Sequence, residues 1–194
     1  QPLKTMQKFT FIIGLILSIQ TLHAQEIQKK QEVCYNPNAL QDTSKRSINS
    51  LAVGHFAKDT VKISYHSPGV RGRIIWGGLV SYDEVWVTGA HNATNLIVSK
   101  PIIINGKEIP PGRYALFTIP GKSEWTVIIN KHWEQHLTNE YDEKDDLLRF
   151  KVRPVKNKHT ERLQYFIELG KEGNGKIAMG WEKLKIQFPF QLKS

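Results

Sequence analysis

From residue 48 onward the chain consists of short runs of β-branched and aromatic residues, interrupted by Gly, Pro and Asn at close intervals. Residues of this kind favour extended strands, and the runs are too short for ordinary helices. The sequence therefore predicts an all-β fold: a single-domain antiparallel β-sandwich of the jelly-roll or immunoglobulin-like (Ig-like) kind. The expected strands are 60–66, 74–76, 85–88, 94–99, 102–104, 113–119, 124–130, 147–153, 162–169, 176–181 and 184–188.

Local patterns add detail to this prediction. Asn105-Gly106 supplies the two positive-φ positions of a type I′ turn, which predicts a tight hairpin after 102–104. We expect this hairpin to continue through 113–119 and 125–129 as a meander. Strict alternation in 162–169 and in 184–188 predicts one buried face, with Leu163 and Leu169 inside and Arg162 on the wetter side. The only stretch with helical character is 132–139.

The first 24 residues have the pattern of a cleaved secretory signal. Lys4 and Lys8 precede an apolar stretch at 9–19, which is too short to cross about 30 Å of hydrocarbon, and Ala24 closes a short polar segment. Met6 is the expected start, with residues 1–5 upstream of it. We therefore expect an exported protein that resides in the periplasm, at the outer membrane or outside the cell, with no transmembrane segment in the mature chain.

Residues 25–47 are rich in Gln, Lys, Asn and Ser and contain few large apolar side chains. Such a segment cannot bury enough surface to offset its ordering entropy, so we expect a flexible leader, with the sandwich domain at 48–194. Cys34 in this leader is the only cysteine, which excludes a disulfide framework. Its role is incidental or that of an intermolecular link.

Removing residues 1–24 takes away Lys4 and Lys8 and no carboxylate, which lowers the formal net charge from +9 to +7. The basic residues are spread along the chain, without a long basic run or a helix-based reading motif, so nucleic acid is not an expected partner. A basic surface on an exported protein favours anionic glycans or lipid headgroups instead.

Three stretches carry motifs that resemble a known family: Tyr-His-Ser-Pro-Gly-Val-Arg-Gly-Arg at 65–73, Trp-Val-Thr-Gly-Ala-His-Asn-Ala-Thr at 86–94, and Pro-Gly-Arg-Tyr-Ala-Leu-Phe-Thr-Ile-Pro-Gly at 111–121. Over about 53–190 the chain is similar to domain-of-unknown-function family 2911, exported proteins found mainly in Bacteroidota that have no established activity. Matching positions are Arg71, Arg73, Trp86, Thr88 and Thr94.

The chain departs from this family pattern at four positions. The pattern has Arg at the position of Ser67, Arg at Val87, Asn at His91 and Glu at Asn92. If those groups form a site in typical members, the resemblance implies that this protein has changed its ligand or lost the site.

The preferred hypothesis is a noncatalytic module that binds a small or anionic ligand, a glycan or a partner protein. Two glycine-bearing loops would form the site, because a guanidinium pair can hold an anion bidentately and rigid scaffolds present ligand-binding loops. The expected ligand-binding residues are Arg71, Arg73, Trp86, Thr88, His91, Asn92 and Thr94. The alternative is that both arginines pair with Asp83 and Glu84 or face water.

The second hypothesis is a hydrolase or isomerase, in which His66 or His91 acts as base and Asp83 or Glu84 orients it. No Gly-x-Ser-x-Gly elbow is present, so nucleophilic serine catalysis has no support.

No metal site and no cofactor are expected. His132 and His136 are four residues apart but lack the Glu placement of a metalloprotease helix, and the acidic residues at 142–146 lack the spacing of a calcium loop. Trp76, Tyr82 and Trp86 are interpreted as core residues, with sugar stacking as the alternative for one ring.

Overall fold

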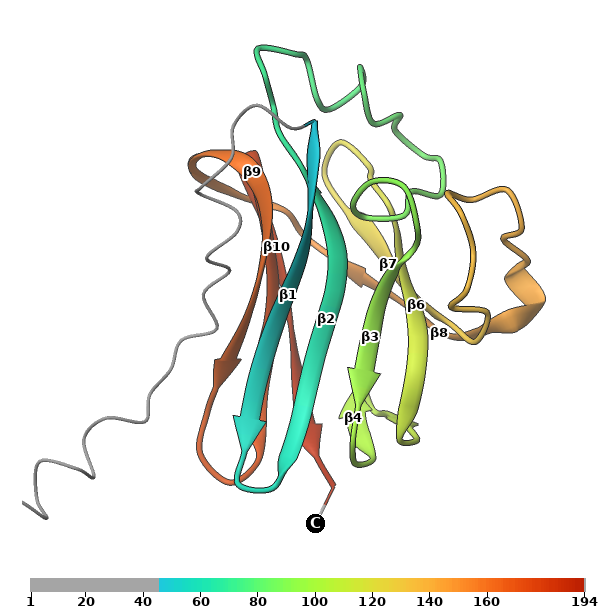
Figure 1. Ribbon diagram of the computed structural model, residues 1–194, viewed down its shortest axis with the longest axis vertical. Helices are drawn as coiled ribbons and strands as arrows, with labels where there is room; N and C mark the ends of the chain where they lie inside the picture. Colours follow the sequence, from blue (N-terminus) through green and yellow to red (C-terminus); the bar gives the residue numbers. More distant parts are fainter. Residues whose placement is uncertain (1–45, 194) are drawn as a thin grey trace, which may run out of the picture. The chain divides into compact units, whose positions relative to one another are not determined.

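The computed structural model describes residues 46–193, which belong to one compact unit. The expected signal segment, the leader up to residue 45 and Cys34 lie outside the described residues. Two sheets pack face to face, and every strand pairing in them is antiparallel (Figure 1). The prediction of an all-β sandwich is confirmed.

The larger sheet has six strands in the order β1-β2-β3-β6-β7-β8. Their bounds are β1 Ser47–Phe56, β2 Asp59–Pro68, β3 Thr94–Val98, β6 Gly112–Ile119, β7 Trp125–Asn130 and β8 Asp146–Val152. The smaller sheet has four strands in the order β5-β4-β10-β9. Their bounds are β5 Lys107–Ile109, β4 Ile102–Ile104, β10 Asn174–Leu192 and β9 Val155–Leu169.

Alternation along the strands produces the core between the sheets. In β2 the side chains of Val61, Ile63 and Tyr65 are buried, and the residues between them are half-buried. Apolar side chains on one face of each sheet leave water together, which is the main stabilising contribution to a sandwich. Four indole rings close one region of this core, with ring centroids 4.9–6.4 Å apart; they belong to Trp76, Trp86, Trp125 and Trp181. The interpretation of Trp76 and Trp86 as core residues is thus confirmed.

Several local expectations were wrong. Residues 74–76 and 85–88 form only isolated bridges, through Trp76 and Trp86, because these apolar runs turn into the core as loop segments. The stretch 132–139 is not helical, and the only helical element in the described part is the short 3₁₀ turn Glu143–Asp145. None of the helices among residues 46–193 has the length and apolarity that a membrane crossing requires.

Strand partnerships also differ from expectation. The Asn105-Gly106 turn forms as predicted, with φ of 48° and 77°, but its hairpin β4–β5 belongs to the smaller sheet, so the meander consists of β6, β7 and β8. The runs 176–181 and 184–188 join into β10 across a bulged register, and β1 was not expected.

The alternation expected for residues 162–169, which lie within β9, breaks at both ends of that stretch. Arg162 is buried, with Nη1 donating to the Ser67 carbonyl at 3.2 Å, whereas Leu169 is 41% exposed. A buried backbone acceptor therefore draws the guanidinium inward, and Leu169, next to the β9–β10 turn, lies at the margin of the core.

Candidate functional site

The outer face of the six-stranded sheet, which points away from the smaller sheet, carries a row of polar side chains. His66 of β2 lies directly opposite Asn49 of β1, and Ser64 lies opposite Asn95 of β3. Directly opposed residues in antiparallel strands project to the same face, so these four side chains share the outer face. Arg113 of β6 joins them, since its strand partner lies two residues beyond Asn95.

The connection between β7 and β8, residues 131–145, folds over part of this outer face. Trp133 and Tyr141 from this connection pack against a second, smaller apolar cluster, formed by Val87, Ala93, Ala115, Phe117 and Ile128. Burial of this cluster holds the connection down on β6 and β7. On β1 and β2 the outer-face residues remain more open: Asn49 is exposed, and Ser64 and His66 are half-buried.

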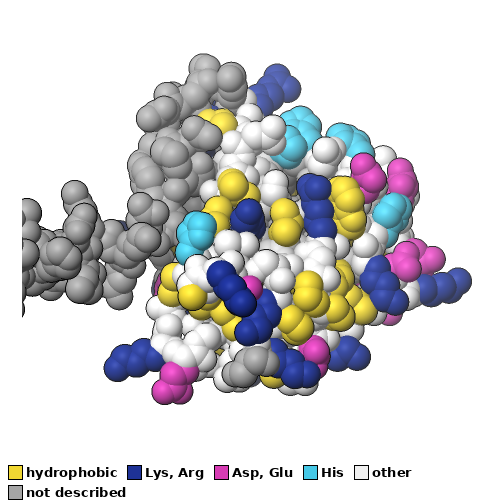
Figure 2. Space-filling view, turned by 60° about the horizontal axis from the view of Figure 1, so that its bottom comes forward, with side chains coloured by type: hydrophobic (Ala, Val, Ile, Leu, Met, Phe, Trp, Pro, Cys, Tyr) yellow, Lys and Arg dark blue, Asp and Glu magenta, His cyan; other side chains and the backbone are white. Residues whose placement is uncertain are grey.

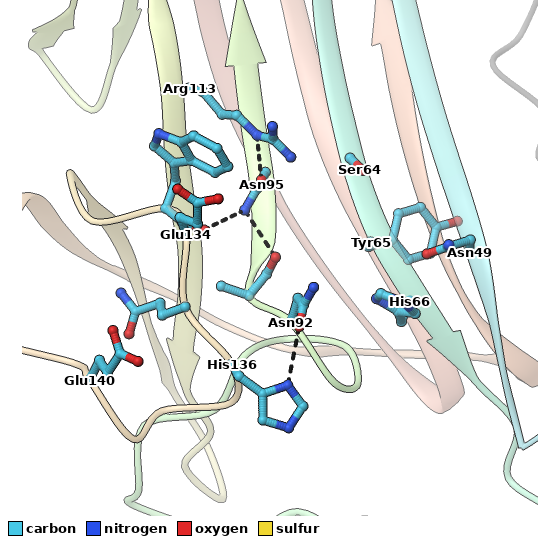
Figure 3. A pocket seen from close by; sticks show the side chains of 13 residues that line it. Asn49, Ser64, Tyr65, His66, Asn92, Asn95, Arg113, Glu134, His136 and Glu140 are labelled. Carbon is cyan, nitrogen blue, oxygen red and sulfur yellow. Dashed lines mark hydrogen bonds between the residues drawn. The ribbon is translucent and has the colours of Figure 1, made fainter.

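A pocket of about 700 Å³ lies where the covered and open regions meet. Figure 3 shows β2 side chains on one side of it and side chains of the β7–β8 connection on the other. Its polar lining includes Ser64, His66, Asn95, Arg113, Glu134 and His136. Asn92, an expected ligand-binding residue, also lines it. Concave sites of this size with convergent polar groups are typical of small-ligand binding.

A network around Asp146 fixes the wall of the pocket. The carboxylate of Asp146 accepts hydrogen bonds from Asn130 Nδ2 at 2.8 Å, Tyr141 Oη at 2.7 Å and Arg149 Nε at 2.5 Å. Burial and the hydrogen bond to Asp146 raise the pKa of Tyr141 to about 12. Charge-assisted bonds of this kind are about twice as strong as neutral ones, so the connection has a defined position.

Backbone hydrogen bonds tie the same connection to the loop before β3. Leu137 N donates to the His91 carbonyl at 2.8 Å, and Ala93 N donates to the Gln135 carbonyl at 3.0 Å. Asn95 Nδ2 donates to the Trp133 carbonyl at 3.2 Å. The β7–β8 connection and the loop before β3 therefore form one connected wall of the pocket.

Arg113 is the fixed cation of the pocket. Its Nε donates to Asn95 Oδ1 at 2.5 Å, and its guanidinium carbon lies 3.9 Å from the centroid of the Trp133 ring. The two contacts hold the guanidinium plane by a hydrogen bond and a cation–π interaction. Its Nη atoms have no hydrogen bond or ion pair within residues 46–193. They are free to donate to a ligand.

Three imidazoles meet at the other end of the pocket. The ring centroid of His91 lies 5.1 Å from that of His66 and 6.5 Å from that of His136. His136 Nδ1 lies 3.1 Å from Asn92 Oδ1 (Figure 3). Burial lowers the pKa of His66, and the neighbouring rings of His91 and His136 lower it further. The His66 ring is accordingly neutral around pH 7.

In the loop that carries Arg71 and Arg73, hydrogen bonds run to carbonyl groups of the loop itself and to Glu161. Arg73 donates from Nε to the Val70 carbonyl at 3.1 Å and from Nη2 to the Gly69 carbonyl at 2.5 Å. The backbone N of Arg71, at a φ of 51°, donates to Glu161 Oε1 at 2.8 Å. Arg73 shares a smaller apolar pocket of about 350 Å³ with Trp86 and His91. One residue of each predicted loop, Arg73 and His91, thus lines this smaller pocket.

Thr88 and Thr94 lie inside the protein, with 0% exposure. Thr94 Oγ1 donates to the Thr88 carbonyl at 3.1 Å, and the Thr88 and Thr118 hydroxyls lie 3.0 Å apart. Tyr165 Oη also donates to the Thr88 carbonyl at 3.1 Å. These bonds hold the loop in shape around Thr88, which has a φ of 51°.

The groups named in the enzyme hypothesis are not brought together as that hypothesis requires. Within residues 46–193, no hydrogen bond or ion pair joins His66 or His91 to Asp83 or Glu84. The backbone N of Asp83 donates to the Pro120 carbonyl at 2.8 Å. Within the same residues, no three His, Cys, Asp or Glu side chains already surround one metal position.

Sequence reasoning missed Arg113 and Asn95. Arg113 stands in the third family motif, 111–121, but that run was interpreted only as a strand. The available signal was parity in β2, where half-buried Ser64 and His66 alternate with buried residues; Asn95 of β3 is itself buried. Polar residues on the outer face of neighbouring strands indicate a shared surface.

On the face of the molecule that Figure 2 presents, side chains of both charges are mixed. Figure 2 shows Lys and Arg side chains scattered among acidic and hydrophobic ones on the face it presents. Pairs such as Lys176 with Glu168, at 2.6 Å, balance part of the basic charge. The pocket, rather than a broad basic patch, is therefore the feature to which a ligand can be assigned.

No curated protein and no solved structure matches this chain. The model of one protein family, described as "Protein of unknown function (DUF2911)", matches residues 47–190. These residues span both sheets of the sandwich, together with the three motifs at 65–73, 86–94 and 111–121. The chain therefore belongs to the DUF2911 family, as its motifs had indicated.

Proposed function

We propose that this protein is a noncatalytic binding module, which holds a small hydroxyl-rich ligand bearing a carboxylate in the pocket on the outer face of the six-stranded sheet. The observation that carries this proposal is the exposed guanidinium of Arg113, which Asn95 and Trp133 hold in place at a pocket of about 700 Å³ and whose Nη atoms pair with no other described residue. A planar fork with two free Nη groups matches a carboxylate bidentately.

The rest of the lining supports a ligand with hydroxyl groups. Ser64 and Asn49 offer donors and acceptors, and Glu134 and Glu140 offer acceptors only. Acidic side chains in the pocket disfavour a ligand that is anionic all round, such as a polyphosphate, because like charges repel. A sugar acid satisfies both requirements, because one end is a carboxylate and the remainder is polyhydroxylated.

Pre-organisation favours binding without large rearrangement. Arg113 is held by Asn95 and Trp133, and the wall of the pocket is held by Asp146. Groups that are fixed before the ligand arrives lose little conformational entropy on binding. Of the residues expected from the sequence, Asn92 lines this pocket and His91 adjoins it, so both belong to the proposed site.

A thermal-shift screen tests the ligand class. Mature protein is heated with D-glucuronate, D-galacturonate and their short oligomers, and with D-glucose and D-galactose as the matched neutral sugars. A ligand that binds the native state raises the melting temperature by mass action. We expect at least one uronate to stabilise the protein and its neutral counterpart to do so far less. Equal shifts, or none, for all compounds would contradict the proposal.

We also propose that the protein is exported. The basic and apolar pattern of residues 6–24 supports export, and the expected location of the protein is the periplasm, the outer membrane or the exterior. Mass spectrometry of the natural protein tests it: the expected N-terminus follows Ala24, and a cytoplasmic protein that retains Met6 would contradict it.

A further inference from the structure

The histidine cluster at one end of the pocket is not needed for the carboxylate proposal. His66 lies near the end of β2, His91 lies in the loop before β3, and His136 lies in the β7–β8 connection. Of the other described histidines, His132 and His159 instead lie 3.8 Å and 3.4 Å from carboxylate oxygens of Glu140 and Glu161. The fold thus brings together three imidazoles that are far apart in the sequence.

We propose that His66, His91 and His136 together bind one divalent transition-metal ion, Zn²⁺ or Cu²⁺. Imidazole nitrogens suit these ions, whereas Mg²⁺ and Ca²⁺ prefer oxygen ligands. Three imidazoles leave one coordination position for water or an anion, which is the arrangement of open rather than closed zinc sites.

Ring spacing is the first support. Two imidazoles bound to one Zn²⁺ at about 2.0–2.1 Å in tetrahedral geometry hold their ring centroids about 5 Å apart. The His66 and His91 centroids are 5.1 Å apart, at an interplanar angle of 69°. This pair has the required separation before any metal arrives.

The third ligand has to move. The 6.5 Å between the His91 and His136 centroids exceeds that spacing, which agrees with the absence of a ready-made three-ligand arrangement within residues 46–193. A shift of roughly 1–1.5 Å in the His136 ring brings it to that spacing from His91, and small side-chain torsion changes supply a shift of this size. Both His91 and His136 are exposed, so neither ring is locked by packing.

The orientation of His136 is the second support. The amide oxygen of Asn92 faces His136 Nδ1 at 3.1 Å. An amide oxygen only accepts, so Nδ1 carries the proton and the lone pair for a metal is on Nε2. Metal-bound histidines usually have such a partner on the second nitrogen.

Calorimetric titration of untagged, EDTA-treated mature protein with Zn²⁺ and with Cu²⁺ tests the site. We expect one ion per chain, and at least tenfold weaker binding in His91→Asn and in His136→Gln. Asn is chosen because it tolerates the φ of 59° at position 91. His132→Gln and His159→Gln are the matched controls and should bind as the wild type does. Wild-type affinity in both cluster variants would overturn the proposal, as would loss in the controls.

Proton NMR of the imidazole rings gives a second readout that does not depend on affinity. Substoichiometric Cu²⁺ should broaden the resonances of His66, His91 and His136 before those of His55, His132 and His159. Broadening that starts at another histidine would also overturn the assignment. Arg113→Gln should retain the metal, so failure of the metal site and failure of the carboxylate site are distinguishable.

Discussion

The guanidinium of Arg113 lies 3.9 Å from the centroid of the Trp133 ring. The first prediction concerns this stack. Trp133→Leu keeps apolar bulk against Phe117 and its neighbours but removes the ring face, so we expect a loss of about 1–2 kcal/mol in the free energy of unfolding. Binding of the best uronate should weaken severalfold, because the cation is less fixed. Urea unfolding and calorimetry measure the two effects.

Trp133→Phe, which keeps an aromatic face, is the control for this prediction and should bind the uronate nearly as the wild type does. Equal weakening in both variants would contradict the stacking role.

A second prediction concerns the carboxylate that anchors the pocket wall. The side chain of Asp146 is 6% exposed and accepts three hydrogen bonds, so Asp146→Ala leaves Asn130 and Tyr141 without that acceptor. We expect a loss of about 2–3 kcal/mol in the free energy of unfolding, measured in urea. Asp145→Ala is the control, because the Asp145 side chain makes no hydrogen bond or ion pair with another described residue. A similar loss in both variants would mean that the network does not anchor the wall.

The raised pKa of Tyr141 predicts that the free energy of unfolding depends on pH. Its folded-state pKa of about 12 lies above the ordinary value of 10, so the native state holds this proton more tightly than the unfolded state does. The contribution to stability is complete below pH 10 and declines as the pH rises from 10 towards 12. Urea unfolding of the wild type and of Tyr141→Phe at pH 9, 10 and 11 measures it. The advantage of the wild type should shrink over this range, and a constant advantage would contradict the raised pKa.

The loop threonines give a fourth prediction, in which stability and binding separate. Thr94→Val removes the hydroxyl that donates to the Thr88 carbonyl, although Tyr165 Oη still donates to that carbonyl. We expect a loss of about 1 kcal/mol in the free energy of unfolding. Uronate affinity, measured at a temperature where both proteins are folded, should not change, because Thr94 is fully buried. A weaker affinity would assign Thr94 to the ligand site after all.

Much of the fold could be predicted from residue patterns, because strand and turn chemistry are local. Runs of β-branched and aromatic residues located β2 and β6 within a few residues, and Asn105-Gly106 identified its hairpin. The partner sheet of that hairpin could not be predicted, since it depends on the distant contact between Ile103 and Gln191. Short apolar runs such as 74–76 and 85–88 have strand composition, but their indoles fill the core from loops.

The candidate site was less accessible to sequence reasoning. Loop motifs indicated His91 and Asn92, which the structure places at the pocket, and Arg73, which binds its own loop carbonyls. Arg113 escaped notice because a strand residue acquires its role only from the register with Asn95. The histidine cluster likewise arises from three separate segments, so no spacing in the sequence announces it.

The central claim is that Arg113 holds the carboxylate of the ligand. Its most direct test is calorimetric titration of the uronate that gives the largest thermal shift, with wild type, Arg113→Gln and Lys171→Gln. Lys171 lies exposed in the turn between β9 and β10, so its variant carries the same charge change away from the pocket. We expect Arg113→Gln to bind this uronate about 10- to 150-fold more weakly than the wild type, the equivalent of about 1.5–3 kcal/mol. We expect Lys171→Gln to bind it as the wild type does. Equal affinities for all three proteins would contradict the central claim.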